Sequence, residues 1–384
     1  MLTRKLEAWL AAGLIDEATQ SRIVAYEAEH ARPLALWAVI GIGVLALALG
    51  ILSVVAANWE DVPGRIRLAI HLGLIATVAT TLMLRGERLE REHPWALEAA
   101  LFVLGVLGLT FFGHLGQVYQ TDSPLWRPLA AWLVLFAPVL LLRGQSWIVA
   151  LGLMAAAIGT VWEYSSTLAQ WTPMGEPDAP WLWMSLVTAL PVLIAPCAAW
   201  MRRHSARDAF WTRMEQLAIA YAMVGASLLC IVASIGEVER GMLAIGSQAL
   251  RAAIALVAAG LVALLHRSRS GSAAGAVLAA CGVTAVLAYL FNDRDIMAGL
   301  LFMALWAAVG AAALYAGWRG VFQLAVAAVA LRLIVLSFEL ASDLLTSGFG
   351  LIVAGLMILG VAWGAVKVSR TFAPPKRDGG EGAA

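Results

Sequence analysis

The amino-acid sequence predicts an all-α fold, a polytopic membrane bundle of about twelve transmembrane helices with both termini in the cytoplasm. The chain is 61% hydrophobic and only 13% charged, and its mean hydropathy is +0.83. This composition excludes a soluble globular domain. Apolar segments of membrane-spanning length recur along the chain. Most basic residues fall on alternate connections between them, which predicts the direction of each crossing.

Each segment supplies roughly 20 residues, the helical length that crosses a hydrocarbon core of about 30 Å. The segments are residues 34–57, 65–84, 96–118, 127–142, 146–164, 181–201, 214–235, 249–265, 273–291, 296–316, 319–341 and 347–366. Two segments contain proline pairs, Pro128 and Pro138 in the fourth and Pro191 and Pro196 in the sixth. Such interrupted helices either line a binding cavity or are kinks that neighbouring helices repair.

The basic residues predict the orientation, because Lys and Arg near helix ends resist translocation. With a cytoplasmic N-terminus, nineteen of the 26 Lys and Arg residues face the cytoplasm, six face outward and Arg332 lies inside a helix. The cytoplasmic set is Arg4, Lys5, Arg22, Arg32, Arg85, Arg88, Arg91, Arg143, Arg202, Arg203, Arg207, Arg213, Arg267, Arg269, Arg319, Lys367, Arg370, Lys376 and Arg377. The outward set is Arg65, Arg67, Arg127, Arg240, Arg251 and Arg294. If segment 127–142 did not cross, every later connection would change sides.

Other features agree with a multi-pass protein of the bacterial inner (plasma) membrane. Ten of the sixteen Trp residues lie near predicted helix ends, where indoles settle at the headgroup level. The three cysteines lie in apolar segments without CxxC spacing, so we interpret Cys197, Cys230 and Cys281 as packing residues. No signal peptide precedes the first span, because residues 1–33 are polar and charged.

The two ends of the chain lie outside the predicted bundle of residues 34–366. Residues 1–33 predict a cytoplasmic helical hairpin, in which Gly13 ends the first helix and Asp16 caps a second helix beginning at Glu17. A hairpin of this size cannot bury a core alone, so residues 3–30 pack on the membrane face or on a cytoplasmic partner. Residues 367–384 predict a disordered cytoplasmic tail.

Charged side chains inside a span mark candidate sites, because a charge at mid-helix costs about 2.5–3.5 kcal/mol on insertion scales. In segment 319–341 and just beyond it, Arg332, Glu339 and Asp343 follow spacings of seven and four, which place them on one helix face. Two interpretations stay open. The residues form a buried ion pair with another helix, or they form an anion or proton site that opens outward.

A second cluster ends segment 96–118 on the outward side and contains His114, Gln117, Tyr119 and Gln120. His114 and Gln117 share a helix face. His114 is either a proton shuttle or a hydrogen-bonded core residue, since imidazole titrates near neutral pH. A single His without a second ligand at suitable spacing does not predict a metal site.

A third outward cluster joins the first two segments. Asn58 and Trp59 precede an Asp-x-Pro turn, and Arg67 and His71, four residues apart, enter the next helix on one face. We interpret this cluster either as an interfacial turn with a snorkelling arginine or as part of an outward cavity.

Several of these residues also support a resemblance to a known family. The hairpin motif Trp9-Leu10-x-x-Gly13-Leu14-Ile15 is followed by Ala57-Asn58-Trp59-x-x-Val62-Pro63, and then by Gly116-Gln117-x-Tyr119-Gln120 and Leu125-Trp126. This pattern over residues 6–126 resembles bacterial membrane proteins that carry domain of unknown function 2157. The stretch from Arg332 to Gly350 resembles a companion uncharacterised membrane domain. The resemblance implies a helical integral membrane fold and implies no activity.

The sequence lacks a Walker loop, a GxSxG elbow and an HExxH pair, so it gives no support to hydrolysis by those routes. We expect a transporter or flippase-like carrier whose outward cavity combines Arg332 with Glu339, His114, Gln117 and Asn58. The alternatives are a membrane enzyme acting on a lipid or lipid-linked substrate at the outer face, and a non-catalytic sensor or scaffold. The expected partners are the lipid bilayer and a small-molecule or lipid substrate. No cofactor and no nucleic acid are expected.

Overall fold

The computed structural model describes residues 6, 9–10, 12–30, 42, 46, 62–171, 179–235, 245–291, 295–340 and 348–372. By internal contacts the chain divides into two compact units, Met1–Arg67 and Leu68–Ala384. In the described ranges every regular element is a helix, which confirms the predicted all-α class.

The first unit contains the second helix of the predicted hairpin, α2 (Glu17–His30). Gly13 adopts a left-handed conformation with φ +67°, and its N–H bonds to the Leu10 carbonyl at 3.0 Å, as expected where a helix ends. The Asp16 carboxylate accepts a hydrogen bond of 2.8 Å from the Thr19 backbone N–H. Asp16 therefore caps α2 as predicted, because its side chain satisfies an N–H group that has no partner within the helix.

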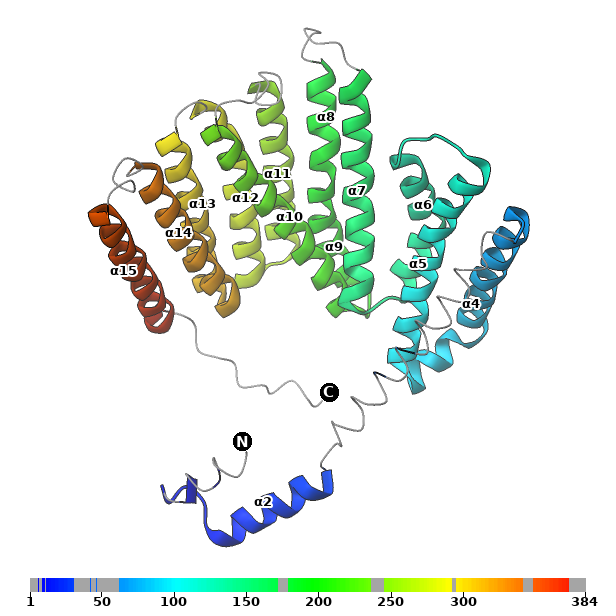
Figure 1. Cartoon of the computed structure of the whole chain (residues 1–384), viewed down its shortest axis with the longest axis horizontal. Helices are drawn as coiled ribbons and strands as arrows, with labels where there is room; N and C mark the ends of the chain where they lie inside the picture. The colour runs from blue at the N-terminus through cyan, green and yellow to red at the C-terminus, as the bar shows by residue number, and fades with distance from the viewer. Residues whose placement is uncertain are drawn as a thin grey trace. The chain divides into compact units, whose positions relative to one another are not determined.

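The remaining helices follow one another through short connections, and successive crossings run antiparallel, with α8 and α9 forming two parts of one crossing (Figure 1). Their bounds are α4 (Gly64–Glu92), α5 (Pro94–Tyr119), α6 (Trp126–Arg143), α7 (Trp147–Trp171), α8 (Ala179–Ala189), α9 (Ile194–His204), α10 (Asp208–Ile235), α11 (Ile245–Leu265), α12 (Arg269–Leu290), α13 (Asp295–Ala316), α14 (Arg319–Leu340) and α15 (Gly348–Phe372).

Ten helices in the described part of the chain are long and apolar enough to cross a membrane. They correspond to ten of the twelve predicted segments. Of the other two, the last predicted segment, 347–366, lies within the 25-residue helix α15. The first, 34–57, falls outside the described residues apart from two isolated positions. Large apolar side chains such as Leu84, Val134 and Leu356 are more than half exposed, which suits a surface that faces hydrocarbon.

The two proline-containing segments behave differently. Helix α6 continues through Pro138 without interruption. The segment 181–201 is broken, because a 3₁₀ turn, η1 (Leu190–Leu193), contains Pro191 and separates α8 from α9. Of the two predicted interruptions, the structure therefore contains the second.

Close helix packing depends on small residues. Alanines such as Ala195 of α9, Ala218 of α10 and Ala258 of α11 are fully buried in one core cluster that also contains residues of α12. On α12, a Cβ built on Gly275 would lie 2.9 Å from the backbone oxygen of Ala259 in α11. The two backbones approach closely only because glycine has no side chain. Trp211 is one of the ten tryptophans near predicted helix ends that were expected at the headgroup level, but it is buried in a core cluster that joins α4–α7 with α9 and α10.

Polar contacts join the connections at the end predicted to be cytoplasmic. Arg143 Nη1 lies 3.5 Å from Glu90 Oε2, which links the end of α6 to the end of α4. Arg207, between α9 and α10, donates to the Gly144 carbonyl at 3.0 Å and to the Leu141 carbonyl. A guanidinium at these last carbonyls satisfies acceptors that a helix end leaves open. These contacts place the three connections at one end, so α5 and α6 each run the full distance between ends.

Burial lowers the pKa of Arg207, whereas the nearby carboxylates of Glu90 and Glu98 raise it. A guanidinium remains protonated in proteins, so Arg207 acts as a fixed positive charge at this junction.

A second polar group at the same end joins α9, α10 and the α11–α12 connection. Arg202 pairs with Glu215 and with Asp208, each at 2.8 Å, and its Nη1 lies 3.4 Å from His266 Nδ1. Glu215 is 4% exposed, so its charge depends on Arg202 for compensation. We interpret both polar groups as structural, because they hold helix ends together and contain their own counter-charges.

Candidate functional site

The predicted site residues fall into three classes. Seven are described with their side chains: Arg67, His71, His114, Gln117, Tyr119, Gln120 and Arg332. Glu339 belongs to α14, but its side chain is not described, and Asn58, Trp59 and Asp343 lie outside the described residues.

The structure brings together two residues that the sequence placed in separate clusters. The Nδ1 atoms of His71 on α4 and His114 on α5 lie 3.5 Å apart. His71 Nε2 lies 2.9 Å from the Leu107 carbonyl, which can only accept, so Nε2 is the donor nitrogen. In neutral His71 the Nδ1 atom is then the acceptor, and the His114 Nδ1–H is the donor. The two imidazoles are thus joined by a single hydrogen bond between their Nδ1 atoms.

The residues at the end of α5 have a mainly structural role. Gln120 is the C-cap of α5 in a left-handed conformation with φ 48°, and its N–H bonds to the Gly116 carbonyl. The Thr121 N–H bonds to the same carbonyl at 3.1 Å. Tyr119 is 58% exposed, and Gln117 is exposed as well. The motif Gly-Gln-x-Tyr-Gln therefore ends a helix, which accounts for Gly116 and Gln120 through their backbone groups without a ligand.

Arg332 lies on α14 against α13. A Cβ built on Gly299 would be 2.9 Å from Arg332 Nη2, so the absence of a side chain on Gly299 makes room for the guanidinium. The Arg332 guanidinium is also close enough to Cys230 on α10 for an electrostatic interaction. Helix α14 packs on α13 and α15, whereas α5 packs on α6 and α7. Among the described helices, the packing places α5 and α14 against different neighbours. The cavity that would unite Arg332 with His114 therefore stays a prediction.

A different polar site surrounds the broken helix, and the sequence analysis did not find it. In a 3₁₀ turn the N–H three residues after Thr188 would close a bond to its carbonyl, but that residue is Pro191, which has no N–H. The Tyr221 hydroxyl of α10 donates to the Thr188 carbonyl instead, at 2.6 Å. Trp162 Nε1 of α7 donates to the Tyr221 oxygen at 2.9 Å. The proline break is therefore repaired by side chains from two other helices.

An arginine lies beside this junction, inside a span. Helix α11 begins at Ile245, so Arg251 is six residues, or about 9 Å, along the helix axis. Arg251 is half-buried, and its guanidinium is close enough to Tyr221 for an electrostatic interaction. Its Nη1 lies 3.5 Å from Gln248 Oε1, and Gln248 is fully buried. None of the ion pairs found within the described ranges involves Arg251.

This arrangement, which we call the broken-helix site, consists of Trp162, Thr188, Tyr221, Gln248 and Arg251. It combines a fixed positive charge, a phenol, an indole and an amide at the half of the bundle predicted to face outward. Guanidinium binds carboxylate and phosphate oxygens with two parallel hydrogen bonds, and aromatic donors add orientation. The chemistry fits recognition of an anionic group. The described residues contain no cluster of three His, Cys, Asp or Glu side chains that could hold a metal ion.

Sequence signals for the broken-helix site were present but pointed elsewhere. Arg251 stands at the outward end of the predicted segment 249–265 and was counted with the outward-facing basic residues, not with the candidate sites. Tyr221 stands alone in an apolar segment and gave no pattern. Only the proline pair in segment 181–201 indicated a break at this position.

Comparison with known proteins agrees with the membrane architecture. A family model described as a predicted membrane protein, DUF2157, matches residues 7–150. No curated protein matches the chain, and no solved structure matches it. The matched region contains the hairpin, His71 and His114, and it ends before the broken-helix site and before the stretch from Arg332 to Gly350, whose resemblance to a companion domain remains a prediction. Over residues 7–150 the chain thus carries the predicted-membrane-protein region DUF2157.

Proposed function

We propose that this multi-pass membrane protein is a transporter or flippase-like carrier of the bacterial inner membrane, which binds an anionic solute or head group at the broken-helix site. The observation that carries the proposal is the position of Arg251, a guanidinium inside a span beside an interrupted helix. Ionisable residues within spans are costly and are characteristic of substrate pathways.

The broken helix supports a carrier over a purely structural bundle. In secondary transporters, substrate sites are formed where transmembrane helices are discontinuous, because the exposed backbone groups contribute to binding. Here the Thr188 carbonyl is such a group, and the Tyr221 hydroxyl donates a hydrogen bond to it. A substrate with a hydroxyl or amine could exchange with that hydroxyl while its anionic group binds Arg251.

The site also has a geometry suited to a change in conformation. The 3₁₀ turn divides the crossing into α8 and α9, and α8 packs on α7 and α11, which supply Trp162 and Arg251. A movement of α8 relative to α9 would therefore alter the distance between the donors and the guanidinium. Hinge motion at an element end of this kind is a recurring means of alternating access.

The proposal is tested with full-length protein reconstituted in liposomes. Flux is measured for a panel of anions (phosphate, sulfate, short dicarboxylates and phosphorylated sugars) and for fluorescent phosphatidylglycerol crossing the bilayer. We expect at least one probe to move, and Arg251→Gln to lower that flux at least tenfold. Arg127→Gln is the matched control, because Arg127 is also predicted to face outward but contacts the Trp126 ring at 5.6 Å and lies outside the site.

Three outcomes would overturn the proposal. These are no flux of any probe, equal flux by Arg251→Gln and the wild type, or equal losses in Arg251→Gln and Arg127→Gln. Chemical conversion of the lipid without its movement would support the enzyme alternative instead.

A further inference from the structure

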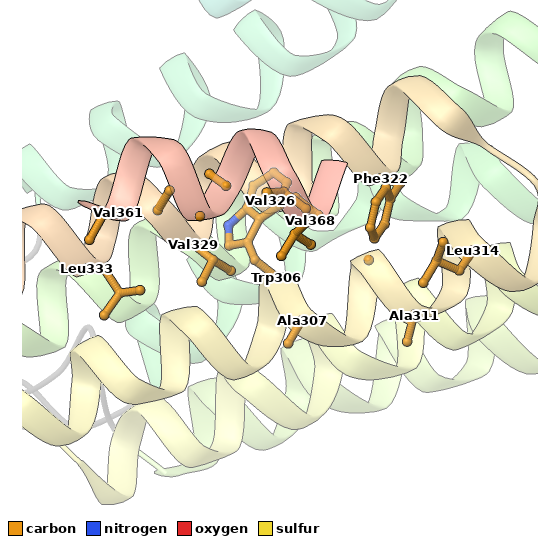
Figure 2. Close-up of a pocket in the computed structure, with 15 residues that line it drawn as sticks. Trp306, Ala307, Ala311, Leu314, Phe322, Val326, Val329, Leu333, Val361 and Val368 are labelled. Atoms are coloured by element: carbon orange, nitrogen blue, oxygen red, sulfur yellow. The ribbon is translucent and has the colours of Figure 1, made fainter. Parts of the chain in front are cut away.

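A cavity of about 500 Å³ lies between the last three helices, away from the broken-helix site. It is an open pocket lined by helices α13, α14 and α15, and Figure 2 shows the Trp306 ring at its centre, with Phe322 and Leu314 toward one end and Leu333 and Val361 toward the other. Its volume is within the range of about 300–1,000 Å³ that ligand sites occupy.

The cavity offers nothing to a polar occupant. All fifteen residues that line it are Gly, Ala, Val, Leu, Phe or Trp. The only polar side-chain atom among them, Trp306 Nε1, donates to Ser227 Oγ of α10 at 3.2 Å. Water needs two to four polar partners to remain in a cavity, so this cavity favours an apolar occupant.

Small residues create the space. A Cβ built on Gly364 of α15 would meet no atom within 4 Å, and one on Gly310 of α13 would reach Ala325 of α14 only at 3.4 Å. Alanines fill neighbouring positions of α13 and α14. A Cβ at Gly364 therefore enters open space, so a larger side chain there would extend from a position that lines the cavity.

One end of the cavity is basic. Leu314, Phe322 and Val368 mark the end predicted to face the cytoplasm, and Arg319, Lys367 and Arg370 are exposed on the same turns of α14 and α15. Lys367 Nζ lies 4.8 Å from the centre of the Trp363 ring. Basic groups at this depth attract anionic head groups of the inner leaflet, with roughly fivefold tighter binding per charge.

We propose that this cavity is a binding site for one anionic phospholipid of the inner leaflet. One acyl chain lies in the cavity between α13, α14 and α15, and the phosphate lies among Lys367, Arg370 and Arg319. The apolar lining of the cavity binds the acyl chain, and the three basic side chains bind the anionic head group. The site is independent of the proposed transport activity, because it shares no residue with the broken-helix site.

The test is native mass spectrometry of the full-length protein in detergent, titrated separately with phosphatidylglycerol and with phosphatidylcholine of identical acyl chains. We expect the wild type to retain one phosphatidylglycerol and to prefer it to phosphatidylcholine. Gly364→Leu fills the cavity and should lower retention of both lipids at least tenfold. Gly360→Leu is the matched control, since Gly360 lies one turn away on α15, does not line the cavity and also has no atom within 4 Å of a built Cβ.

The head-group contribution is tested separately. The double variant Lys367→Gln and Arg370→Gln should reduce the preference for phosphatidylglycerol about 25-fold, at roughly fivefold per charge, and leave phosphatidylcholine binding unchanged. The proposal fails if Gly364→Leu retains lipid as well as Gly360→Leu does. It also fails if the wild type is a lipid-free dimer that Gly364→Leu dissociates, because a second copy would then occupy the cavity.

Discussion

The hydrogen bond from Tyr221 to the Thr188 carbonyl gives the sharpest test of how the broken helix is held. Tyr221→Phe removes one hydroxyl and leaves the ring in place. The hydroxyl donates at 2.6 Å to the Thr188 carbonyl, to which Pro191 cannot donate because proline has no N–H. The same hydroxyl accepts at 2.9 Å from Trp162 Nε1. The substitution therefore leaves the carbonyl of the buried Thr188 without this donor and the Nε1 of the half-exposed Trp162 without this acceptor.

The expected loss of stability follows from these two bonds. A buried polar group left unsatisfied costs about 1–3 kcal/mol. Interhelical hydrogen bonds in membranes contribute less, about 0.6 kcal/mol on average and about 1.7 at most, because the unfolded chain in the membrane also finds partners. We expect Tyr221→Phe to lower the free energy of unfolding by about 1–2 kcal/mol. Tyr315→Phe, at a position 58% exposed, should change it by less than about 0.5 kcal/mol.

A double-mutant cycle with Pro191→Ala tests the cause. Alanine restores the N–H that can close the turn onto the Thr188 carbonyl, so Tyr221→Phe should cost about 1 kcal/mol less in that background. Unfolding in mixed micelles with increasing SDS, followed by circular dichroism, measures all four proteins. The reasoning is refuted if Tyr221→Phe is as stable as the wild type, or if its cost is the same in the wild-type and the Pro191→Ala backgrounds.

Three further substitutions test other parts of the structure, the first two by the same unfolding measurement. Glu215→Gln should cost about 2 kcal/mol, because it removes the buried one of the two carboxylates that compensate Arg202 and leaves only the exposed Asp208, and a change below about 0.5 kcal/mol would contradict the structural role of this pair. Gly275→Ala should cost about 1–3 kcal/mol, because its Cβ would lie 2.9 Å from a backbone oxygen of α11, while Gly260→Ala, with no atom within 4 Å, should be neutral or slightly stabilising. Hydrogen bonding by Thr19 lowers the pKa of Asp16 from its ordinary value of 3.8, so the cap stabilises α2 above about pH 4 and is lost as pH falls through the lowered pKa. The Thr19 amide shift in NMR spectra should follow this titration in the wild type and stay flat in Asp16→Asn.

The helices could be predicted from the sequence because the bilayer imposes their length and composition. Segment 127–142 corresponds to α6 (Trp126–Arg143), and segment 319–341 corresponds to α14 (Arg319–Leu340). The start of α2 was predictable for a local reason, because Asp16 supplies the cap from the adjacent position. The length, the apolar composition and the cap of a helix all depend on residues close together in the sequence, so they can be predicted from it.

The polar sites could not be predicted to the same extent, because they depend on which helices pack together. His71 and His114 are 43 residues apart, and both were candidates, but nothing in either segment indicated that they form a pair. Tyr221 acquires its role from Pro191, thirty positions earlier on another helix. Arg251 was predicted at the outward end of segment 249–265, and nothing in that segment indicated a broken helix beside it.

Helix α7 connects the two polar sites of the bundle. It packs on α5, which carries His114, and on α10, which carries Tyr221, and its own Trp162 belongs to the broken-helix site. The DUF2157 match ends at residue 150, near the start of α7, so the histidine pair lies inside the matched region and Arg251 lies outside it. If substrate binds at Arg251, specificity is a property of the chain beyond the matched region. The matched region then contributes the histidine pair, and α7 packs on the helices that carry His114 and Tyr221.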